Sequence, residues 1–197
     1  MGKALVIDDE KTIRFSFKKR LQKEKIDVDV ADGWDQAEPL VNSNEYDVVF
    51  LDIRMPGKNG IEILKEIMQL QPDATVVMMT GDPSTETAAQ ALRYGAAEYL
   101  EKPVTKEQLL KIAFRSIDRR NLILEKRELE KKTKDYQLKI DQLISDEDTE
   151  FDSDEFQEMA QDLVKHRQKS SDELKSVQSK LGDLSLIHIS EPTRPTL

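Results

Sequence analysis

The sequence predicts an α/β fold in which helices cover both faces of a parallel β-sheet. Short apolar runs alternate with amphipathic segments of helical spacing through residues 1–118, a rhythm that is typical of repeated βαβ units. Residues 48–51 are an unbroken run of Val, Val, Phe and Leu, which is the composition of a strand buried on both faces of a parallel sheet. At 197 residues the chain has room for one such domain and a smaller second part.

Five segments are expected to form the strands of this sheet. They are residues 4–7, 26–31, 48–51, 75–79 and 98–100. Residues 26–31 alternate Ile and Val with Asp, which is the period-two pattern of an edge strand. Residues 4–7 and 75–79 are nearly continuous apolar runs, so they are expected in the interior of the sheet.

The segments between these strands carry helical patterns. Residues 11–25 place Ile13, Phe17 and Leu21 at helical spacing among Lys and Arg, which predicts an amphipathic helix. Pro39 weakens the helical signal of residues 34–41. Further helices are expected at residues 61–70, at residues 84–94 behind a Ser or Thr cap, and from residue 105 onwards.

Composition excludes several classes of function. The formal net charge of −9 argues against a nucleic-acid-binding surface, which requires clustered Lys and Arg. The chain has no Cys, so disulfides and thiolate metal sites are excluded. There is neither a signal-peptide pattern nor an apolar run near the roughly 18 residues of a membrane span. We therefore expect a soluble cytoplasmic protein without nucleic-acid or membrane partners.

Polar side chains stand at the carboxyl end of nearly every expected strand. Because these ends share one edge of a parallel sheet, we expect the side chains to converge there. Carboxylates about 5 Å apart repel by roughly 3 kcal/mol per pair at an effective dielectric of 20, so a cation is expected among them. Oxygen-only ligands favour a hard ion, and Mg²⁺ is the ion expected here. The residues concerned are Asp8, Asp9, Asp52, Thr80 and Lys102.

Phosphoryl transfer is the chemistry that suits this set. Asp52 would be the nucleophile, the metal and Lys102 would neutralise charge on the equatorial oxygens, and the Thr80 hydroxyl would donate to one of them. The alternative for any single carboxylate is a helix cap or a solvated loop position. The full set in this order favours a site.

The motifs resemble those of the receiver domains of two-component response regulators, over residue 3 to about residue 117. The resemblance rests on the acidic pair Asp8-Asp9, the loop Leu51-Asp52-Ile53-Arg54-Met55-Pro56-Gly57, the pair Thr80-Gly81 and the run Tyr99-Leu100-Glu101-Lys102-Pro103. It implies a flavodoxin-like (βα)5 fold with strand order 2-1-3-4-5. It also implies that Asp52 accepts a phosphoryl group from a histidine kinase or phosphotransfer protein. Such a domain is a phosphoacceptor that assists its own phosphorylation and dephosphorylation, not an enzyme acting on other substrates.

The resemblance further implies roles for individual residues. Mg²⁺ would be bound by Asp9, Asp52 and the backbone carbonyl of Arg54, with Asp8 helping through water. The peptide bond before Pro103 would be cis. Thr80 would move towards the phosphoryl group and Tyr99 would turn inward, which changes the surface of the fourth helix, fifth strand and fifth helix. In such domains, the positions of Arg54 and Asp82 tune dephosphorylation.

A long helix is expected to continue from the last receiver helix. From residue 105 to about residue 144 there is no Gly or Pro, which predicts a helix of about 40 residues whose part at residues 119–144 is a connector. Apolar residues recur every seven positions, but the companion positions are mostly polar, so the seam of a coiled coil would be weak. The apolar series is Leu122, Leu129, Tyr136 and Leu143, and the companions are Lys126, Thr133 and Ile140.

An acidic loop and a second amphipathic helix are expected at residues 145–155 and 156–183. The helix repeats two series of heptad positions: Phe156, Leu163, Ser170 and Val177, and Ala160, Arg167, Leu174 and Leu181. The two helices could pair as a hairpin, or each could join a partner chain. The receiver face and the helical extension are thus candidate surfaces for a homodimer, and a solvated spacer is the alternative. Residues 184–197 resemble the translation of a sequencing-library adapter, so the natural chain is expected to continue past Asp183.

The expected function is a phosphorylation-activated receiver that controls an output or partner through its helical extension. One alternative is a stand-alone receiver and coiled-coil adaptor that acts by binding proteins. Another is a metal-dependent phosphohydrolase of related fold. That class typically carries a second Asp two residues after its nucleophile, where this chain has Arg54. After residue 117 the sequence has no helix-turn-helix pattern with a basic recognition face.

Overall fold

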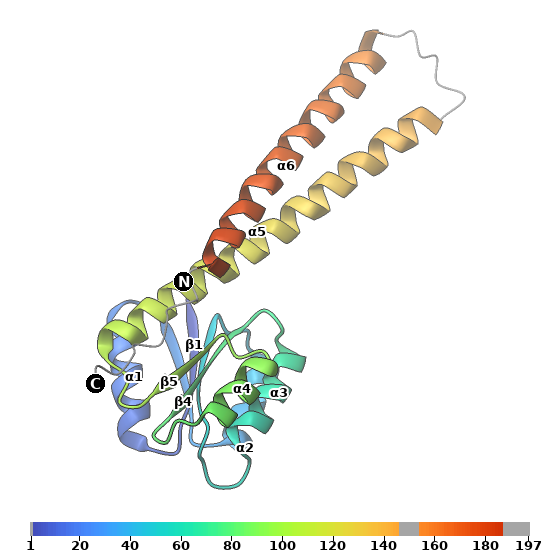
Figure 1. The fold of residues 1–197 in the computed structure, drawn as a ribbon. Coiled ribbons are helices and arrows are strands. Elements are labelled where there is room, and N and C mark those ends of the chain that lie inside the picture. Colours follow the sequence, from blue (N-terminus) through green and yellow to red (C-terminus); the bar gives the residue numbers. More distant parts are fainter. Residues whose placement is uncertain (1, 146–153, 187–197) are drawn as a thin grey trace, which may run out of the picture. The chain divides into compact units, whose positions relative to one another are not determined.

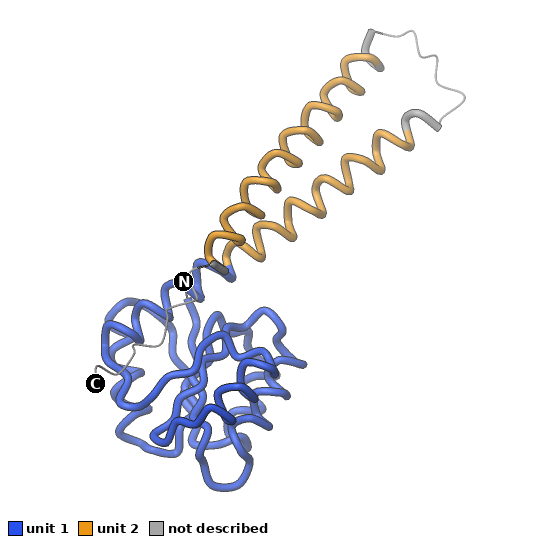
Figure 2. The backbone as a smooth tube through the Cα atoms, in the orientation of Figure 1, with its two compact units in different colours: residues 1–120 blue, residues 121–197 orange. Residues whose placement is uncertain are grey.

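The computed structural model describes residues 2–145 and 154–186. The chain divides into two compact units, Met1–Arg120 and Asn121–Leu197, which are coloured separately in Figure 2. Within the described residues, no helix is both long enough and apolar enough to cross a membrane.

A five-stranded parallel sheet forms the centre of the first unit. Its strand order is β2-β1-β3-β4-β5, and every neighbouring pair is parallel. This confirms the predicted fold class and strand order. The strands are β1 (Lys3–Ile7), β2 (Asp27–Ala31), β3 (Val48–Asp52), β4 (Thr75–Thr80) and β5 (Glu98–Glu101).

Helices cover both faces of the sheet (Figure 1). On one face, side chains of α2, α3 and α4 join a core with Leu5 and Ile7 of β1. On the other face, α1 and the start of α5 join a second core with Ala4 and Val6. Successive residues of a strand point to opposite faces, so β1 contributes to both cores in alternation. The helices are α1 (Lys11–Lys23), α2 (Trp34–Ser43), α3 (Gly60–Leu70), α4 (Thr85–Arg93) and α5 (Lys106–Ser145).

Two helices depart from their predicted lengths for local reasons. Helix α1 ends at Lys23, earlier than predicted, and Lys25 has a positive φ of 62°, a conformation that a right-handed helix cannot contain. Helix α2 continues through Pro39 as far as Ser43. Trp34 and Val41, which flank Pro39, are buried in the core. Tertiary packing therefore outweighs the loss of one backbone hydrogen bond at the proline.

The second unit contains the rest of α5 and helix α6 (Asp154–Leu186), which lie side by side and antiparallel in Figure 2. Leu129, Ser170 and Val177, which occupy predicted heptad positions, are buried. Of the two arrangements that the sequence left open, the structure has the intramolecular hairpin. Most of the predicted acidic loop at residues 145–155 lies outside the described residues. So does the tail from residue 187 onwards, whereas residues 184–186 end α6.

Candidate functional site

Four strand ends form the candidate site. Asp52 is the last residue of β3, and Thr80 is the last residue of β4. Asp8 and Asp9 directly follow β1, and Lys102 directly follows β5. The parallel topology therefore puts these residues at one edge of the sheet, as the sequence predicted.

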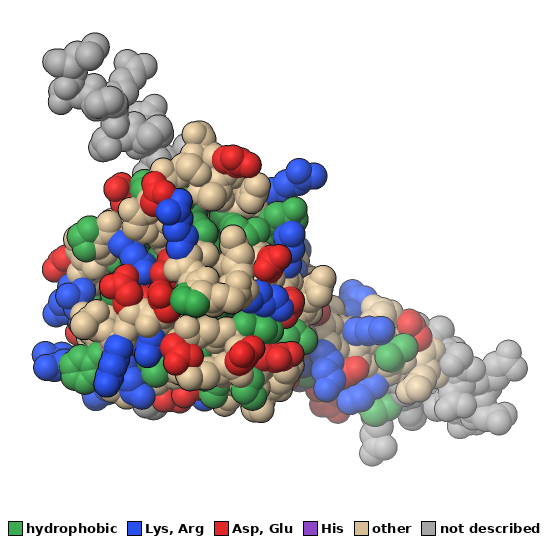
Figure 3. Space-filling model, turned by 90° about the horizontal axis from the view of Figure 1, so that it is seen from below, with side chains coloured by type: hydrophobic (Ala, Val, Ile, Leu, Met, Phe, Trp, Pro, Cys, Tyr) green, Lys and Arg blue, Asp and Glu red, His purple; other side chains and the backbone are tan. Residues whose placement is uncertain are grey.

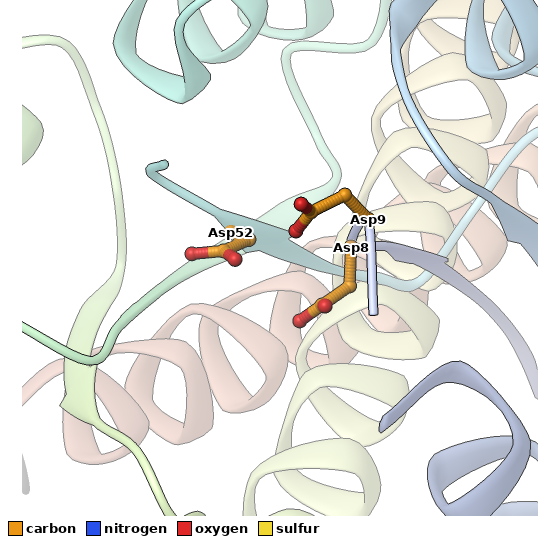
Figure 4. A group of neighbouring side chains, drawn as sticks. All are labelled: Asp8, Asp9 and Asp52. Atoms are coloured by element: carbon orange, nitrogen blue, oxygen red, sulfur yellow. The ribbon is translucent and has the colours of Figure 1, made fainter. Parts of the chain in front are cut away.

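Three carboxylates gather at the centre of this edge. One oxygen from each of Asp8, Asp9 and Asp52 lies within 4.8 Å of the others. Figure 4 shows the side chains of Asp8 and Asp9 extending from their backbone towards the side on which Asp52 lies. Asp8 and Asp52 are buried, whereas Asp9 is exposed, so the cluster is open to solvent on the side of Asp9.

The Lys102 ammonium is shared by the two buried carboxylates. Its Nζ lies 2.6 Å from Asp52 Oδ2 and 2.8 Å from Asp8 Oδ2, and its side chain is only 12% exposed. Burial alone lowers the pKa of Lys102, but the hydrogen bonds and charges of Asp52 and Asp8 outweigh it, so the pKa lies above 10.5. Lys102 therefore stays charged at neutral pH and offsets part of the negative charge of the cluster.

Asp8 is the carboxylate most affected by its surroundings. Burial raises its pKa above the ordinary value of 3.8, against the opposing effects of Lys102 and of the backbone N–H of Glu10. The Glu10 N–H donates to Asp8 Oδ1 at 2.9 Å. Burial disfavours the ionised form of Asp8, so a further cation beside this carboxylate would stabilise its negative charge.

These residues fit a divalent metal ion. Asp8 Oδ2 is buried and accepts no properly aligned hydrogen bond from the described residues, although the Lys102 ammonium is close by. Oxygen atoms from Asp8, Asp9 and Asp52 are the hard ligands that Mg²⁺ prefers. The backbone N–H of Arg54 lies beside these carboxylates and donates to Asp52 Oδ1 at 3.3 Å.

The loop after Asp52 is fixed by the start of α3. Asn59 caps this helix, because its side chain accepts from the N–H of Ile61 at 2.9 Å while the Glu62 side chain accepts from the Asn59 N–H. Gly60 packs so closely under the loop that a Cβ atom there would collide with the carbonyl oxygen of Asp52. A glycine is required here because the backbone at the start of α3 closely approaches the backbone of Asp52 and Ile53.

Thr80 and Tyr99 are both hydrogen-bonded to the segment that leads into α4. The Thr80 hydroxyl accepts from the Asp82 N–H at 3.1 Å and lies 3.3 Å from the Asp82 carbonyl oxygen. The Tyr99 hydroxyl lies 2.7 Å from Thr87 Oγ1, and the Ser84 N–H donates to it at 3.4 Å. Thr80 is thus placed at the site edge with its hydroxyl engaged away from Asp52.

Sequence reasoning missed two of these partnerships. It named Ser84 only as a helix cap and did not consider Thr87, although a hydroxyl at the third helical position was visible as a local signal. It assigned both Arg54 and Asp82 to the neighbourhood of the site, but it did not predict the ion pair that joins their side chains. The peptide bond between Lys102 and Pro103 is cis in the structure.

Charge on the face shown in Figure 3 is mixed. Acidic and basic side chains are interspersed there, with hydrophobic side chains between them.

The geometry supports attack by a carboxylate on an electrophile that carries negative charge. Asp52 is held by Lys102 on one oxygen and by the Arg54 N–H on the other. An anionic group arriving at Asp52 would meet the Lys102 ammonium and a carboxylate cluster whose oxygen atoms fit a divalent cation. Positive charge placed in advance in this way is what stabilises a transferring phosphoryl group.

Comparison with known proteins agrees with this chemistry. Residues 4–114 match the family model of the response regulator receiver domain. The chain is 34% identical over 121 residues to the alginate biosynthesis transcriptional regulatory protein AlgB of Pseudomonas aeruginosa. The match covers 61% of this chain but only 27% of that relative, so the chain spans about a quarter of its length.

Solved structures of similar fold are receivers as well. One is a response regulator from Burkholderia pseudomallei with a phosphorylated aspartic acid, a calcium ion and citrate. It has a TM-score of 0.55 and 29% identity, with 57% of this chain and 66% of that chain covered. Another is the beryllofluoride-activated NtrC4 receiver domain dimer, with a TM-score of 0.58 and 32% identity, covering 61% of this chain and 99% of that chain.

The family model covers more than half of the 197 residues, and it coincides with the parallel sheet and its acidic edge. The solved receivers share this strand arrangement, and the sequence motifs had pointed to the same family. On these grounds, the chain belongs to the two-component response regulators, and its first unit is a receiver domain.

Proposed function

We propose that the chain is a phosphorylation-controlled switch in which Asp52 accepts a phosphoryl group from a histidine kinase or phosphotransfer protein. The observation that carries this proposal is the Lys102 ammonium, which bridges the buried carboxylates of Asp52 and Asp8 beside the exposed Asp9. In that arrangement Asp52 can act as the nucleophile. Lys102 lies beside it to bind an anionic group, and Asp8 and Asp9 lie beside it to bind a metal ion. The protein is then a phosphoacceptor that assists its own phosphorylation and dephosphorylation.

The proposed reaction uses the side chains of this chain as follows. A carboxylate oxygen of Asp52 forms the new bond to phosphorus while the bond from phosphorus to the donor nitrogen or oxygen breaks and the donor leaves with that electron pair. Lys102 offsets charge on the phosphoryl oxygens, and the Thr80 hydroxyl turns from Asp82 to donate to one of them. Asp8, Asp9, Asp52 and the backbone carbonyl of Arg54 would hold Mg²⁺, which supplies further positive charge when bound.

The direct test is labelling with a small phosphodonor such as acetyl phosphate, followed by the mass of the intact protein. We expect wild-type protein to gain one phosphoryl group in the presence of Mg²⁺, and Asp52→Ala protein to gain none. Asp118→Ala is the matched control, because Asp118 is an exposed carboxylate on α5 away from the strand ends. We expect Lys102→Ala protein to keep some labelling and to lose most of its response. Full labelling of the Asp52→Ala protein would refute the assignment.

We propose that the switch is read through a surface that joins two copies in the cytoplasm. One feature supports a homodimer: the similar NtrC4 receiver domain is a beryllofluoride-activated dimer. The test is the molar mass by light scattering, with and without Mg²⁺ and beryllofluoride. A change of mass would support the dimer. A constant mass despite bound beryllofluoride would favour the alternative of an adaptor that binds other proteins.

A further inference from the structure

The Tyr99 hydroxyl is tied to the first turn of α4. It lies 2.7 Å from Thr87 Oγ1, and the Ser84 N–H donates to it at 3.4 Å. Ser84 is the N-cap of α4, and Thr87 is in the first turn of that helix. The Tyr99 ring packs against the core on the face that α3 and α4 cover. A strand residue is thus connected to the start of a neighbouring helix through its one polar atom.

Thr87 Oγ1 has three oxygen neighbours in this network. It lies 2.7 Å from the Tyr99 hydroxyl, 2.8 Å from Ser84 Oγ and 3.2 Å from the Ser84 carbonyl oxygen. Because a hydroxyl can both donate and accept, either Tyr99 or Thr87 can be the donor in the bond that joins them. The backbone N–H of Thr87 donates separately to Ser84 Oγ at 3.2 Å, which caps the helix.

Thr80 is held to the same segment. Its hydroxyl accepts from the Asp82 N–H and lies near the Asp82 carbonyl oxygen. Residues 80–87 therefore carry partners for both hydroxyls that the proposed switch requires. A move of Thr80 to a phosphoryl group on Asp52 would break its hydrogen bonds at Asp82, and a turn that carries the Tyr99 hydroxyl away from α4 would break its hydrogen bond at Thr87.

We propose that Thr87 is a positioning residue that holds Tyr99 in the resting conformation and thereby sets the threshold for activation. This inference rests on the proposed function and adds a residue to it. In this proposal the hydrogen bond between Tyr99 and Thr87 belongs to the resting state and is lost when Tyr99 turns, so it opposes the ligand that selects the other state. When the binding-competent state is a minor one, apparent affinity rises in proportion to its population.

The experiment is a titration of the full chain with beryllofluoride at constant Mg²⁺, followed by ¹⁹F NMR of the bound ligand. Thr87→Val removes the hydroxyl, and with it the contacts with Tyr99 and Ser84, but keeps the side-chain shape and the backbone N–H that donates to Ser84 Oγ. We expect it to raise the apparent affinity about two- to tenfold, which is the range for one neutral hydrogen bond. Thr87→Ser restores the hydroxyl and should restore wild-type affinity. Thr85→Val is the matched control, because Thr85 is exposed in the same turn.

A double-mutant cycle separates this role from a purely structural one. Tyr99→Phe should raise the affinity as Thr87→Val does, and the double variant should show less than the sum of the two gains, because both changes remove the hydrogen bond that joins these side chains. Amide exchange of the first turn of α4 should also quicken in the unliganded Thr87→Val protein. A Thr87→Val affinity equal to that of Thr85→Val, or additive effects in the cycle, would overturn the inference. If wild-type protein binds no beryllofluoride while the exchange result holds, the proposed function fails instead.

Discussion

Replacing Lys102 by Met would leave two buried carboxylates without their shared ammonium. The Asp8 side chain is fully buried, and the Asp52 side chain is 5% exposed. Their ligand oxygens lie within 4.8 Å of each other, a separation at which two charges repel by roughly 3 kcal/mol at an effective dielectric of 20. Removal of one partner from a buried ion pair typically costs about 3–5 kcal/mol. We therefore expect the unfolding free energy of metal-free Lys102→Met protein at pH 7 to fall by about 3 kcal/mol.

The loss should depend on pH in a definite direction. The folded pKa of Lys102 lies above 10.5, so its stabilising contribution is complete at pH 7 and would be lost only as the pH rises through that folded pKa. In the variant, the folded pKa of Asp8 should rise further above 3.8, because its neighbouring cation is gone. The folded variant then binds protons more tightly than the unfolded chain. Its deficit relative to wild type should therefore shrink as the pH falls towards 4.

Urea denaturation in EDTA at pH 7 and near pH 4 measures both effects. Excess Mg²⁺ at pH 7 should restore part of the loss by binding the carboxylates of Asp8, Asp9 and Asp52. Lys58→Met is the control, because Lys58 pairs with Glu66 at a half-exposed position. Surface pairs of this kind contribute about 0–1 kcal/mol. A deficit that is independent of pH, or no larger than that of Lys58→Met, would refute the electrostatic account of the site.

Two further predictions concern the same edge of the sheet. Asp8→Asn removes a carboxylate whose pKa is raised by burial. The metal-free variant should therefore be more stable at pH 7, by about 1 kcal/mol in urea denaturation, while calorimetry should show weaker Mg²⁺ binding. A less stable variant with unchanged Mg²⁺ affinity would contradict this. Gly60→Ala should lower stability by about 2 kcal/mol and reduce labelling of Asp52, because its Cβ would collide with the loop backbone. Gly33→Ala is the control, since no atom lies within 4 Å of its added Cβ; equal losses in the two alanine variants would contradict the close-approach argument.

The sheet and its acidic edge could be predicted from the sequence because each follows from the order of apolar runs and of the polar residues that end them. Continuous apolar runs such as residues 48–51 require burial on both faces, and that requirement fixes a parallel sheet covered by helices. Once the strands are parallel, the residue that ends each one lies at the same edge. The convergence of Asp8, Asp52 and Lys102 then follows from topology alone, without knowledge of any side-chain contact.

The contacts around α4 could not be obtained in the same way. The bond between Tyr99 and Thr87 depends on where a tyrosine hydroxyl lies relative to a helix that begins 15 residues before it at Ser84. The ion pair between Arg54 and Asp82 likewise joins two loops that are 28 residues apart in sequence. Periodicity predicts which face of an element is buried, but not which polar atoms meet across two elements.

The pairing of α5 with α6 shows the same limit in another form. The heptad positions predicted which side chains are buried, among them Leu129 and Val177, yet the same apolar stripe would serve a hairpin or a partner chain. In the structure, Arg167 donates to Gln137 Oε1 at 2.7 Å. A polar pair in a seam adds little stability, but a slip of one heptad would leave the guanidinium without this acceptor. The register of the hairpin is thus selected by polar contacts that a hydrophobic pattern does not contain.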